Sequence, residues 1–456
     1  MFDLKKYKNI YMIGIGGISM SGLAHILRSW NFYVSGSNNE DSKIIEDLEK
    51  NGINVFIGHN YNNINDHIDL VVYTAAVKSD NPELIHAKEL NIPTMERGEF
   101  LGELTKLFKD TIGVSGTHGK TTTTSMVSEC FLAANMDPTI QVGSILKSIE
   151  GNYRVRKSDY FIIEACEYCD SYLNFKQKSA IVLNIDNDHL EYIKTFDNII
   201  NSFQKYVGNL PKDGLLVLNG DDKNCFDLKN YTNANCITYG LNDNNMYYAK
   251  NIEFNEFGYP KYELYKNKEY VDIIELSILG EHNVLNSLAC IALCDNYGID
   301  IKYIKIGLLN YTGAARRFEY KGKFLGANVY DDYGHHPTEI DAVSKSILNK
   351  KFNSSWVIFE PHTYSRVKEH NKDFAKSLVN FDNIIITDIY AAREKNEFNV
   401  SSEDIVNELK KLGKDSTHIS SFEDIKDYLA TRVEVDDLIL TLGAGYVTKI
   451  SEILTK

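Results

Sequence analysis

Residues 116–124 read Gly-Thr-His-Gly-Lys-Thr-Thr-Thr-Thr and join an apolar segment, residues 111–114, to a helical pattern of apolar residues that starts near Lys120. At such a junction the free backbone N–H groups and the dipole of the helix favour a polyphosphate. The glycines let the backbone approach phosphate groups, Lys120 supplies a positive charge, and the Thr121 hydroxyl is suited to Mg²⁺. Val114 stands where the usual phosphate loop has its first glycine. The stretch therefore predicts a shortened phosphate loop, with a simple turn that caps a helix as the alternative.

Strand and helix patterns alternate on both sides of this loop, which predicts an α/β fold with mainly parallel sheets. The expected strands cover residues 9–13, 32–35, 55–57, 70–74, 160–163, 180–185, 215–218, 356–359, 383–387 and 437–442. Residues 231–278 alternate polar and apolar side chains, which predicts short antiparallel strands at a sheet edge. The chain of 456 residues is long enough for roughly three domains. We place them at residues 1–108, 109–312 and 313–456.

The composition is that of an acidic globular protein, with 43% hydrophobic residues, 25% charged residues and a net charge of -14. Because nucleic-acid binding depends on clustered Lys and Arg, this charge argues against a nucleic-acid partner. The sequence shows neither a signal segment nor an apolar run of the roughly 18 residues that a membrane span needs. We therefore expect a cytoplasmic protein without a membrane partner. The seven cysteines are scattered, as reduced core thiols are, and the Cys166 to Cys169 pair lacks the second pair of a zinc site.

A second glycine-rich turn, Gly-Ile-Gly-Gly-Ile-Ser-Met-Ser-Gly at residues 14–22, follows the first expected strand. It is similar to a dinucleotide-binding turn, but Ser19 replaces the final glycine. The next strand also ends at Asn38, without the acidic residue that binds ribose in nicotinamide enzymes. We therefore expect a diphosphate at this helix N-terminus rather than hydride transfer. A tight turn without a ligand is the alternative.

Two polar side chains follow strands near the phosphate loop. Glu164 ends the strand at residues 160–163, and His189 follows the strand at residues 180–185. Because parallel strands end at the same edge of a sheet, both are expected beside the loop as candidate ligands of Mg²⁺. Polar residues also end strands and cap helices for structural reasons, so this alternative stays open for each.

Four further segments concentrate side chains suited to binding a nucleotide or a substrate. They are Glu-His-Asn at residues 281–283, Arg-Arg-Phe-Glu at residues 316–319, Asp-Asp-Tyr-Gly-His-His-Pro-Thr-Glu at residues 331–339 and Phe-Glu-Pro-His-Thr-Tyr-Ser-Arg at residues 359–366. An amide and an imidazole at a helix start suit a purine, and a guanidinium suits a terminal phosphate. The last two segments lie where a doubly wound sheet presents its ligand groups. A helix cap, a surface charge pair and ordinary loop polarity are the alternatives.

Taken in this order, the segments resemble those of the Mur ligases, and residues 14–22 and 331–339 resemble the alanine-adding branch of that family and its relative that adds a tripeptide. The resemblance implies an N-terminal Rossmann-like domain that binds a UDP-sugar, a central P-loop ATPase domain and a C-terminal Rossmann-like domain that binds the amino acid. It also implies a ligase that joins L-alanine to the lactyl carboxylate of UDP-N-acetylmuramate through an acyl phosphate, with ATP and Mg²⁺. We expect a monomer or a weak homodimer.

The resemblance assigns site residues by position. The UDP-sugar would contact Gly14, Gly16, Gly17, Ser19 and Ser21. ATP would contact Gly116, Thr117, His118, Gly119, Lys120, Thr121, Thr122, His282, Asn283, Arg317 and Asp331. Mg²⁺ would be held by Thr121, Glu164 and His189, and the amino acid by His362 and Arg366. The expected catalytic residues are Lys120, Glu164, His189, Arg316 and His335, the last as a candidate base for the amine.

Three positions depart from the common pattern of that family. Asn38 replaces an acidic residue, Thr363 replaces an arginine, and Cys166 alters the segment after Glu164, so the family role of Glu167 is not carried over. Three other functions stay open: a ligase that adds a tripeptide, a nicotinamide-dependent oxidoreductase that uses the first glycine-rich turn, and a non-catalytic regulator that binds a UDP-sugar.

Overall fold

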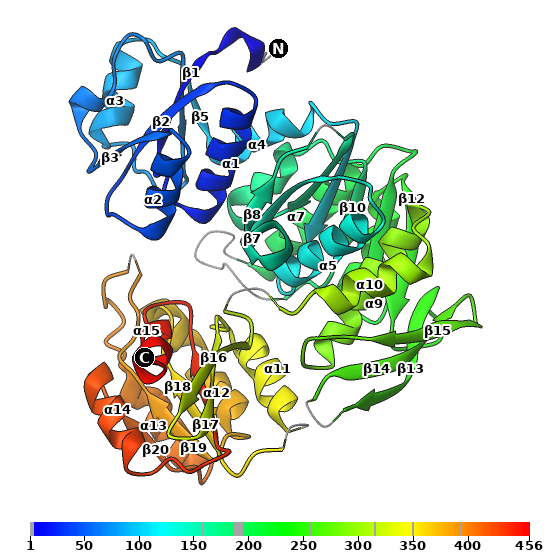
Figure 1. Cartoon of the computed structure of the whole chain (residues 1–456), viewed down its shortest axis with the longest axis vertical. Helices are drawn as coiled ribbons and strands as arrows, with labels where there is room; N and C mark the ends of the chain where they lie inside the picture. Colours follow the sequence, from blue (N-terminus) through cyan, green and yellow to red (C-terminus); the bar gives the residue numbers. More distant parts are fainter. Residues whose placement is uncertain are drawn as a thin grey trace. The chain divides into compact units, whose positions relative to one another are not determined.

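The computed structural model describes residues 4–156, 158–186, 195–255, 258–313, 316–348, 351–392 and 394–456. These residues form three β-sheets with helices packed on them, which confirms the predicted α/β class (Figure 1). Contacts divide the chain into two compact units. The first consists of Met1–Ala249, Leu264–Val271 and Leu285–Asn310, and the second of Lys250–Glu263, Asp272–Val284 and Tyr311–Lys456. The predicted domain boundaries at residues 108 and 312 stay predictions.

The first sheet has five parallel strands in the order β3-β2-β1-β4-β5. Its elements are β1 (Asn9–Ile13), α1 (Ile18–Ser29), β2 (Tyr33–Asn38), α2 (Lys43–Lys50), β3 (Asn54–Ile57), β4 (Leu70–Tyr73), α3 (Pro82–Glu89), β5 (Thr94–Glu96) and α4 (Arg97–Thr105). Alternate residues of β1 enter different cores, with Ile10 and Met12 packed against α1 and α2, and Tyr11 and Ile13 against α3. The strand order reverses beside β1, so the turn after β1 lies at the ligand-binding edge of the sheet.

The second sheet has ten strands in the order β15-β14-β13-β12-β11-β10-β6-β9-β7-β8. Its strands are β6 (Asp110–Ser115), β7 (Thr139–Leu146), β8 (Gly151–Arg154), β9 (Tyr160–Glu164), β10 (Ser179–Val182), β11 (Leu215–Asn219), β12 (Asn235–Gly240), β13 (Tyr247–Phe254), β14 (Pro260–Lys266) and β15 (Glu269–Glu275). The accompanying helices are α5 (Lys120–Ala133), α7 (Phe196–Gly208), α8 (Lys223–Asp227), α9 (His282–Asn296) and α10 (Ile301–Asn310). Strand β6, which leads into the phosphate loop, pairs in parallel with β9 and β10.

Two predictions for this sheet need correction. The antiparallel arrangement predicted for residues 231–278 is wrong for β12, which pairs in parallel with both β11 and β13. The strand predicted at residues 180–185 ends at Val182. Leu183 continues the apolar pattern, but the backbone and side chain of Asn184 bond to the phosphate loop instead of a neighbouring strand. Apolar periodicity alone does not reveal this change of partner.

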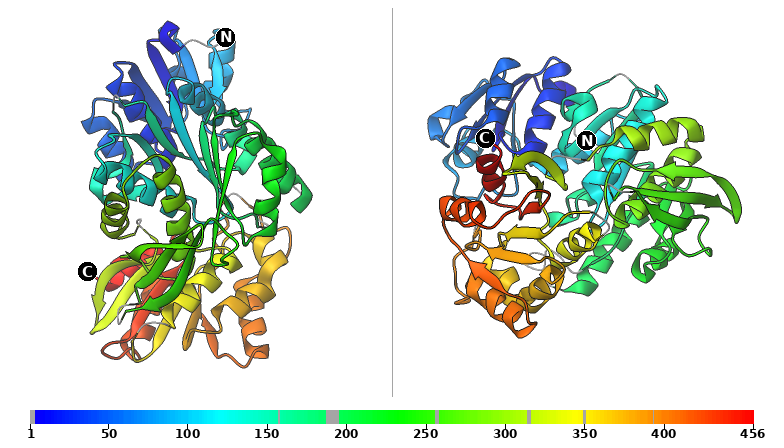
Figure 2. Two further views of the ribbon diagram at one scale, coloured as in Figure 1. Left: turned by 90° about the vertical axis from the view of Figure 1, so that its right-hand side faces the viewer. Right: turned by 60° about the horizontal axis from the view of Figure 1, so that its bottom comes forward.

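The third sheet has the order β16-β17-β21-β18-β19-β20 and is parallel except for β16. Its strands are β16 (Glu319–Phe324), β17 (Ala327–Asp332), β18 (Ser355–Phe359), β19 (Asn383–Ile386), β20 (Ser416–His418) and β21 (Leu438–Leu442). Its helices are α11 (Pro337–Ile347), α12 (Tyr364–Leu378), α13 (Ser402–Lys411), α14 (Phe422–Ala430) and α15 (Thr448–Leu454), drawn in yellow to red in Figure 2. Val357 and Phe359 of β18 pack with α11 to α13, whereas Trp356 and Ile358 pack with α14 and α15. Both faces of the sheet are therefore covered.

Candidate active site

The phosphate loop follows β6 and has two glycines in the left-handed region, Gly116 with φ +134° and Gly119 with φ +84°. A Cβ atom on Gly119 would lie 2.7 Å from Oδ1 of Asn286, and a Cβ on Gly116 would lie 2.9 Å from Cβ of Leu183. Both the backbone angles and the lack of space therefore require glycine. Gly119 is also the residue before the first turn of α5, so the free N–H groups of that helix begin at the loop.

Residues after β10 hold the loop in place. The Asn184 side chain accepts a hydrogen bond from the His118 N–H at 2.7 Å and donates one to the His118 carbonyl at 3.0 Å. The Thr117 hydroxyl accepts from the Asp186 N–H at 2.9 Å, and the ring of His118 lies 3.2 Å from the Asp186 carboxylate. The sequence analysis did not assign a role to Asn184 or Asp186. Their position directly after a buried strand that adjoins β6 was the only available signal.

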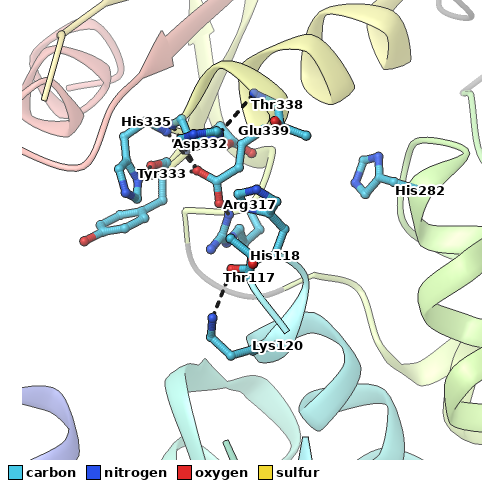
Figure 3. Close-up of polar contacts among 12 residues, drawn as sticks. Thr117, His118, Lys120, His282, Arg317, Asp332, Tyr333, His335, Thr338 and Glu339 are labelled. Atoms are coloured by element: carbon cyan, nitrogen blue, oxygen red, sulfur yellow. Dashed lines mark hydrogen bonds and ion pairs between the residues drawn. The ribbon is translucent and has the colours of Figure 1, made fainter. Parts of the chain in front are cut away.

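Lys120 lies inside the loop, with its ammonium group bonded on three sides. It donates to the carbonyls of Gly116 at 2.6 Å and Thr117 at 3.0 Å and forms an ion pair with Glu167 at 3.0 Å, and Figure 3 shows the contact with Thr117. Burial is the largest single influence and disfavours the charged amine, but the charge and hydrogen bond of Glu167, together with the smaller contributions of Cys166 and Glu164, outweigh it and raise the pKa of Lys120. The loop therefore holds a permanent cation at neutral pH. Glu167, whose role was left open from the sequence, is 2% exposed.

Glu164 ends β9 beside the loop, as predicted. Its carboxylate accepts a hydrogen bond from the Gly143 N–H at 2.5 Å, and a Cβ on Gly143 would lie only 2.7 Å from it. Thr121 belongs to the first turn of α5. A carboxylate and a hydroxyl are oxygen ligands of the kind that Mg²⁺ prefers, so the residues present fit this ion. His189, the third predicted ligand, lies outside the described residues.

The first glycine-rich turn follows β1 in the same way. Gly14 has φ +80°, and a Cβ on Gly16 would lie 2.8 Å from the side chain of Asn38 at the end of β2. At the start of α1 the Ser19 hydroxyl accepts hydrogen bonds from the Arg97 guanidinium and from the Gln141 amide, each at 3.2 Å. Neither of these two partners was identified from the sequence.

The other two residues of this turn that were assigned to the UDP-sugar differ in exposure. The Ser21 hydroxyl donates to the Ile18 carbonyl at 3.0 Å and is buried, whereas Gly17 is exposed at the start of α1. The turn at residues 14–22 contains no lysine, and Arg97 brings a positive charge to it through its contact with Ser19.

In the second unit, Arg316 and Asp331 bind each other. The Arg316 guanidinium lies 3.0 Å from the Asp331 carboxylate and donates to the carbonyls of Gly443 at 2.5 Å and Ala444 at 3.4 Å. Asp331 has no exposed surface and also accepts from Thr448 at 2.9 Å. These contacts place Arg316 within the fold of the unit, where it fastens residue 316 to the end of β21.

Arg317 is held differently, in a cluster with residues 331–339. Its guanidinium lies 3.5 Å from the Glu339 carboxylate and 5.7 Å from the ring centre of Tyr333, and its side chain is 32% exposed (Figure 3). The Glu339 carboxylate also accepts from the His335 N–H at 3.1 Å, and His336 caps α11. Among the described residues, Arg316 therefore donates to two backbone carbonyls, whereas Arg317 contacts the side chains of Glu339 and Tyr333.

Asp332, next to the buried Asp331, has a perturbed carboxyl group. Burial raises the pKa of Asp332 to about 6, although the charge of Arg317 and hydrogen bonds from the N–H groups of Gly334 and Phe318, each 2.7 Å long, favour the ionised form. These bonds fasten the end of β17 to residue 318, so the segment from 316 to 318 is fixed at several points.

The predicted amino-acid contacts lie together after β18. The His362 ring contacts Arg366, with 2.8 Å between its Nδ1 and the guanidinium. The ring also stacks on Tyr390 at 5.7 Å and meets the edge of His335 at 5.1 Å. Tyr390 lines a cavity of about 450 Å³ together with Glu360, Thr387, Asp388, Phe422 and Tyr446. His335, His362 and Arg366 are therefore brought together by the fold.

The start of α9 carries the two residues assigned to adenosine. Asn283 is buried and donates to the Leu279 carbonyl at 2.6 Å, while His282 is exposed. Gly280 has φ +94°, and a Cβ at this position would lie 2.5 Å from the His282 ring. The chain therefore turns sharply into the helix and presents the imidazole at its first residue.

Three models of protein domains match the N-terminal, central and C-terminal parts of the chain. The description "Mur ligase family, catalytic domain" matches residues 9–109, "Mur ligase middle domain" matches residues 114–294, and "Mur ligase, glutamate ligase domain" matches residues 316–445. The chain belongs to the Mur ligase family. This confirms both the family and the three-domain fold expected for a Mur ligase.

Individual relatives agree with this family. The UDP-N-acetylmuramate--L-alanine ligase of Acetivibrio thermocellus is 46% identical over 100% of this chain and 97% of its own length, and that of Clostridium acetobutylicum is 48% identical over 99% and 98%. The crystal structure of the UDP-N-acetylmuramate-alanine ligase of Thermotoga maritima superposes with a TM-score of 0.84, at 30% identity and 98% coverage of both chains. A murein peptide ligase of Psychrobacter arcticus, at 22% identity and a TM-score of 0.73, shares the fold. Among the described residues of the chain, no helix is long and apolar enough to cross a bilayer.

Proposed function

We propose that this Mur ligase joins L-alanine to the lactyl carboxylate of UDP-N-acetylmuramate and converts ATP to ADP and phosphate. The product would be UDP-N-acetylmuramoyl-L-alanine, a precursor of peptidoglycan. The observation that carries the choice of substrates is the identity of 46–48% over nearly the whole chain to relatives named for this reaction. We expect the protein to act in the cytoplasm as a monomer or a weak homodimer.

The phosphate loop provides the energy-transfer half of this reaction. Backbone N–H groups from Gly116 to Thr122 would bind the phosphates of ATP, and Lys120 would leave its present partners to contact the terminal phosphates. The substrate carboxylate attacks the γ-phosphate and forms an acyl phosphate, and Lys120 spreads the charge that develops. Glu164 and Thr121, with His189, would hold Mg²⁺, which neutralises phosphate charge when bound.

The first glycine-rich turn would bind the other nucleotide. Gly14, Gly16 and Gly17 allow the backbone to approach the diphosphate of the UDP-sugar, and Ser19 would contribute its hydroxyl. Arg97, which already contacts Ser19, is the cation that we add to this site. For Ser21, whose hydroxyl bonds to its own helix, we propose a backbone contact only.

The second unit would bind the incoming amino acid and part of ATP. Arg366 is the guanidinium proposed for the alanine carboxylate, with His362 fixing its orientation. His335, packed against His362, is the candidate base that keeps the amine neutral for its attack on the acyl carbon.

The adjacent arginines would have separate roles in this scheme. Of the two, we assign Arg317 to the terminal phosphate, because Arg316 is bound to Asp331 and two carbonyls. Asp331 would then act by positioning Arg316, and His282 with Asn283 would bind adenosine.

A substrate matrix tests the proposal. Purified protein with ATP, Mg²⁺ and UDP-N-acetylmuramate is offered L-alanine, glycine, L-serine or the tripeptide, and phosphate release is measured together with the mass of the product. We expect turnover with L-alanine and a product heavier by one alanyl residue. Turnover with the tripeptide but not with alanine would overturn the choice of substrate, and reduction of NAD without ATP hydrolysis would overturn the ligase.

A further inference from the structure

The fold gathers three of the seven cysteines into one buried cluster, although the sequence scatters them. Cys130 lies on α5, and Cys290 and Cys294 lie one turn apart on α9. The Sγ atoms of Cys130 and Cys290 are 3.6 Å apart, those of Cys290 and Cys294 are 3.8 Å apart, and all three lie within 4.8 Å of one another. None of the three side chains is exposed. The reaction proposed above uses none of them.

The distances fit ligands that share a single ion. Thiolates that share one soft ion through bonds of about 2.3 Å lie about 3.4–3.8 Å apart, from the pyramidal geometry of an ion with a lone pair to the tetrahedral geometry. The two measured separations match this spacing within a few tenths of an ångström. Soft thiolate ligands select soft ions over Mg²⁺ or Ca²⁺. Two of the three Sγ–Sγ separations are therefore already close to those of sulfurs that share an ion, and the third is within 4.8 Å.

The backbone around the cluster is packed tightly and keeps the sulfurs in place. Gly307 of α10 lies against Cys130, and a Cβ on this glycine would be 2.5 Å from the Cys130 Cα. The Cys130 thiol donates to the carbonyl of Ile304, which also belongs to α10, at 3.5 Å. Cys290 and Cys294 are spaced i and i+4 and therefore share one face of α9. Rigid helices thus present all three sulfurs to one point.

The net charge of the three thiolates with the bound ion distinguishes among the soft ions. Among the described residues, no fourth His, Cys, Asp or Glu joins the three cysteines in this group. Three thiolates with a divalent ion would leave one negative charge in a site without solvent exposure, which is costly. Trivalent arsenic bound by three thiolates is neutral, and its binding starts from neutral species: arsenious acid exchanges three As–OH bonds for three As–S bonds, and each thiol proton leaves with a hydroxide as water. No oxidant or reductant is needed.

We propose that Cys130, Cys290 and Cys294 form a binding site for a trivalent, thiophilic metalloid, with arsenite as its simplest form. The site joins the helix that begins with Lys120 to the helix whose Asn286 lies against Gly119 of the phosphate loop. Cys290 follows Asn286 by one helical turn. Occupation would thus fasten together the two helices that frame the phosphate loop. This inference does not depend on the identity of the ligase substrates.

Binding of arsenite to the full-length protein tests the site. Reduced protein is incubated with sodium arsenite for hours, so that local opening admits the reagent to the buried thiols, and is then desalted. We expect one arsenic per chain by elemental analysis. The intact mass under native conditions should rise by one arsenic atom less three hydrogen atoms, and the melting temperature should rise by several degrees because the folded chain binds the ion.

Variants separate this cluster from the other thiols. Cys290→Ala and Cys294→Ala should each lose the bound arsenic, whereas Cys225→Ala, a buried thiol elsewhere in the same unit, and the double variant Cys166→Ala with Cys169→Ala should keep it. Retention by Cys290→Ala or loss in the Cys166 and Cys169 variant would overturn the proposal. If a cluster variant fails to fold, the mass of the wild-type adduct still decides, because a two-sulfur adduct keeps one hydroxyl on arsenic and contradicts the three-sulfur site. If Cd²⁺ displaces the bound arsenic from the wild-type chain, the argument that the buried site requires a neutral complex is wrong.

Discussion

Two turns of this chain have the same local architecture and different chemistry. Residues 14–19 and residues 116–121 each follow a buried parallel strand, contain at least one glycine with positive φ and begin a helix. In the phosphate loop the cation, Lys120, is part of the turn and pairs with the buried Glu167. In the first turn the cation, Arg97, comes from α4 and reaches Ser19 from outside. The two turns therefore share a backbone suited to phosphates, and the position of the cation distinguishes the turn proposed for transfer from the turn proposed for binding.

The largest effect is expected for Lys120→Ala. Removing the cation of the phosphate loop should lower kcat by roughly 10³-fold, about 4 kcal/mol of transition-state stabilisation. Binding of UDP-N-acetylmuramate should be unchanged, because the first turn has its own cation. Phosphate release and calorimetric titration of the UDP-sugar measure the two quantities. Full activity in this variant would remove the distinction between the turns.

Gly119→Ala should act mainly on ATP. Its φ of +84° and the 2.7 Å approach of Asn286 leave no space for a methyl group. A non-glycine residue in the left-handed region costs about 1–2 kcal/mol, so we expect the KM for ATP to rise roughly tenfold or more. Gly14→Ala, at φ +80° in the first turn, is the matched control and should raise the KM for the UDP-sugar instead. A shared pattern of KM changes in both variants would contradict separate nucleotide sites.

Glu167→Gln tests the buried pair through its pH dependence. Glu167 raises the pKa of Lys120 above its unfolded value, so the pair stabilises the fold below the unfolded pKa of lysine and loses this contribution as pH rises through the folded pKa. Without the carboxylate, burial dominates and the pKa of Lys120 falls. We expect the alkaline limb of the kcat profile to move to lower pH and the free energy of unfolding at pH 7 to fall by about 1–3 kcal/mol. Glu164→Gln removes a carboxylate that raises the pKa of Lys120 less than Glu167 does, and it serves as the comparison. An alkaline limb that does not move in Glu167→Gln would sink the assignment.

The smallest effect is expected for Arg97→Met. This change keeps the apolar part of the side chain but removes the cation that contacts Ser19. A partly exposed charge contributes about 1 kcal/mol, so the KM for the UDP-sugar should rise roughly fivefold while the KM for ATP stays constant. Steady-state kinetics with each substrate varied in turn provides the measurement. A rise in the KM for ATP alone would assign Arg97 to the other turn.

The sequence predicted those parts of the site in which neighbouring residues act together. Both glycine-rich turns, Lys120, and Glu164 at a strand end were found because glycine, a following helix and an adjacent strand leave a local pattern. Partners that are distant in the sequence were not predicted. Asn184 holds His118 from 66 residues away, and Arg97 reaches Ser19 from 78 residues away, so no spacing rule connects them. The cysteine cluster joins positions 160 residues apart for the same reason.

By itself, the sequence determined the α/β class, the Mur ligase family and the two turns that would bind phosphates, because periodicity and glycine act over short distances. Only the tertiary structure decided which charged groups neutralise one another. It paired Arg316 with Asp331 and Arg317 with Glu339, although the two arginines are adjacent in the sequence. It also placed Glu167 on Lys120 and three cysteines around one point. Electrostatic and sulfur contacts depend on distances of a few ångströms, and for residues far apart in the chain these distances are set by the packing of strands and helices.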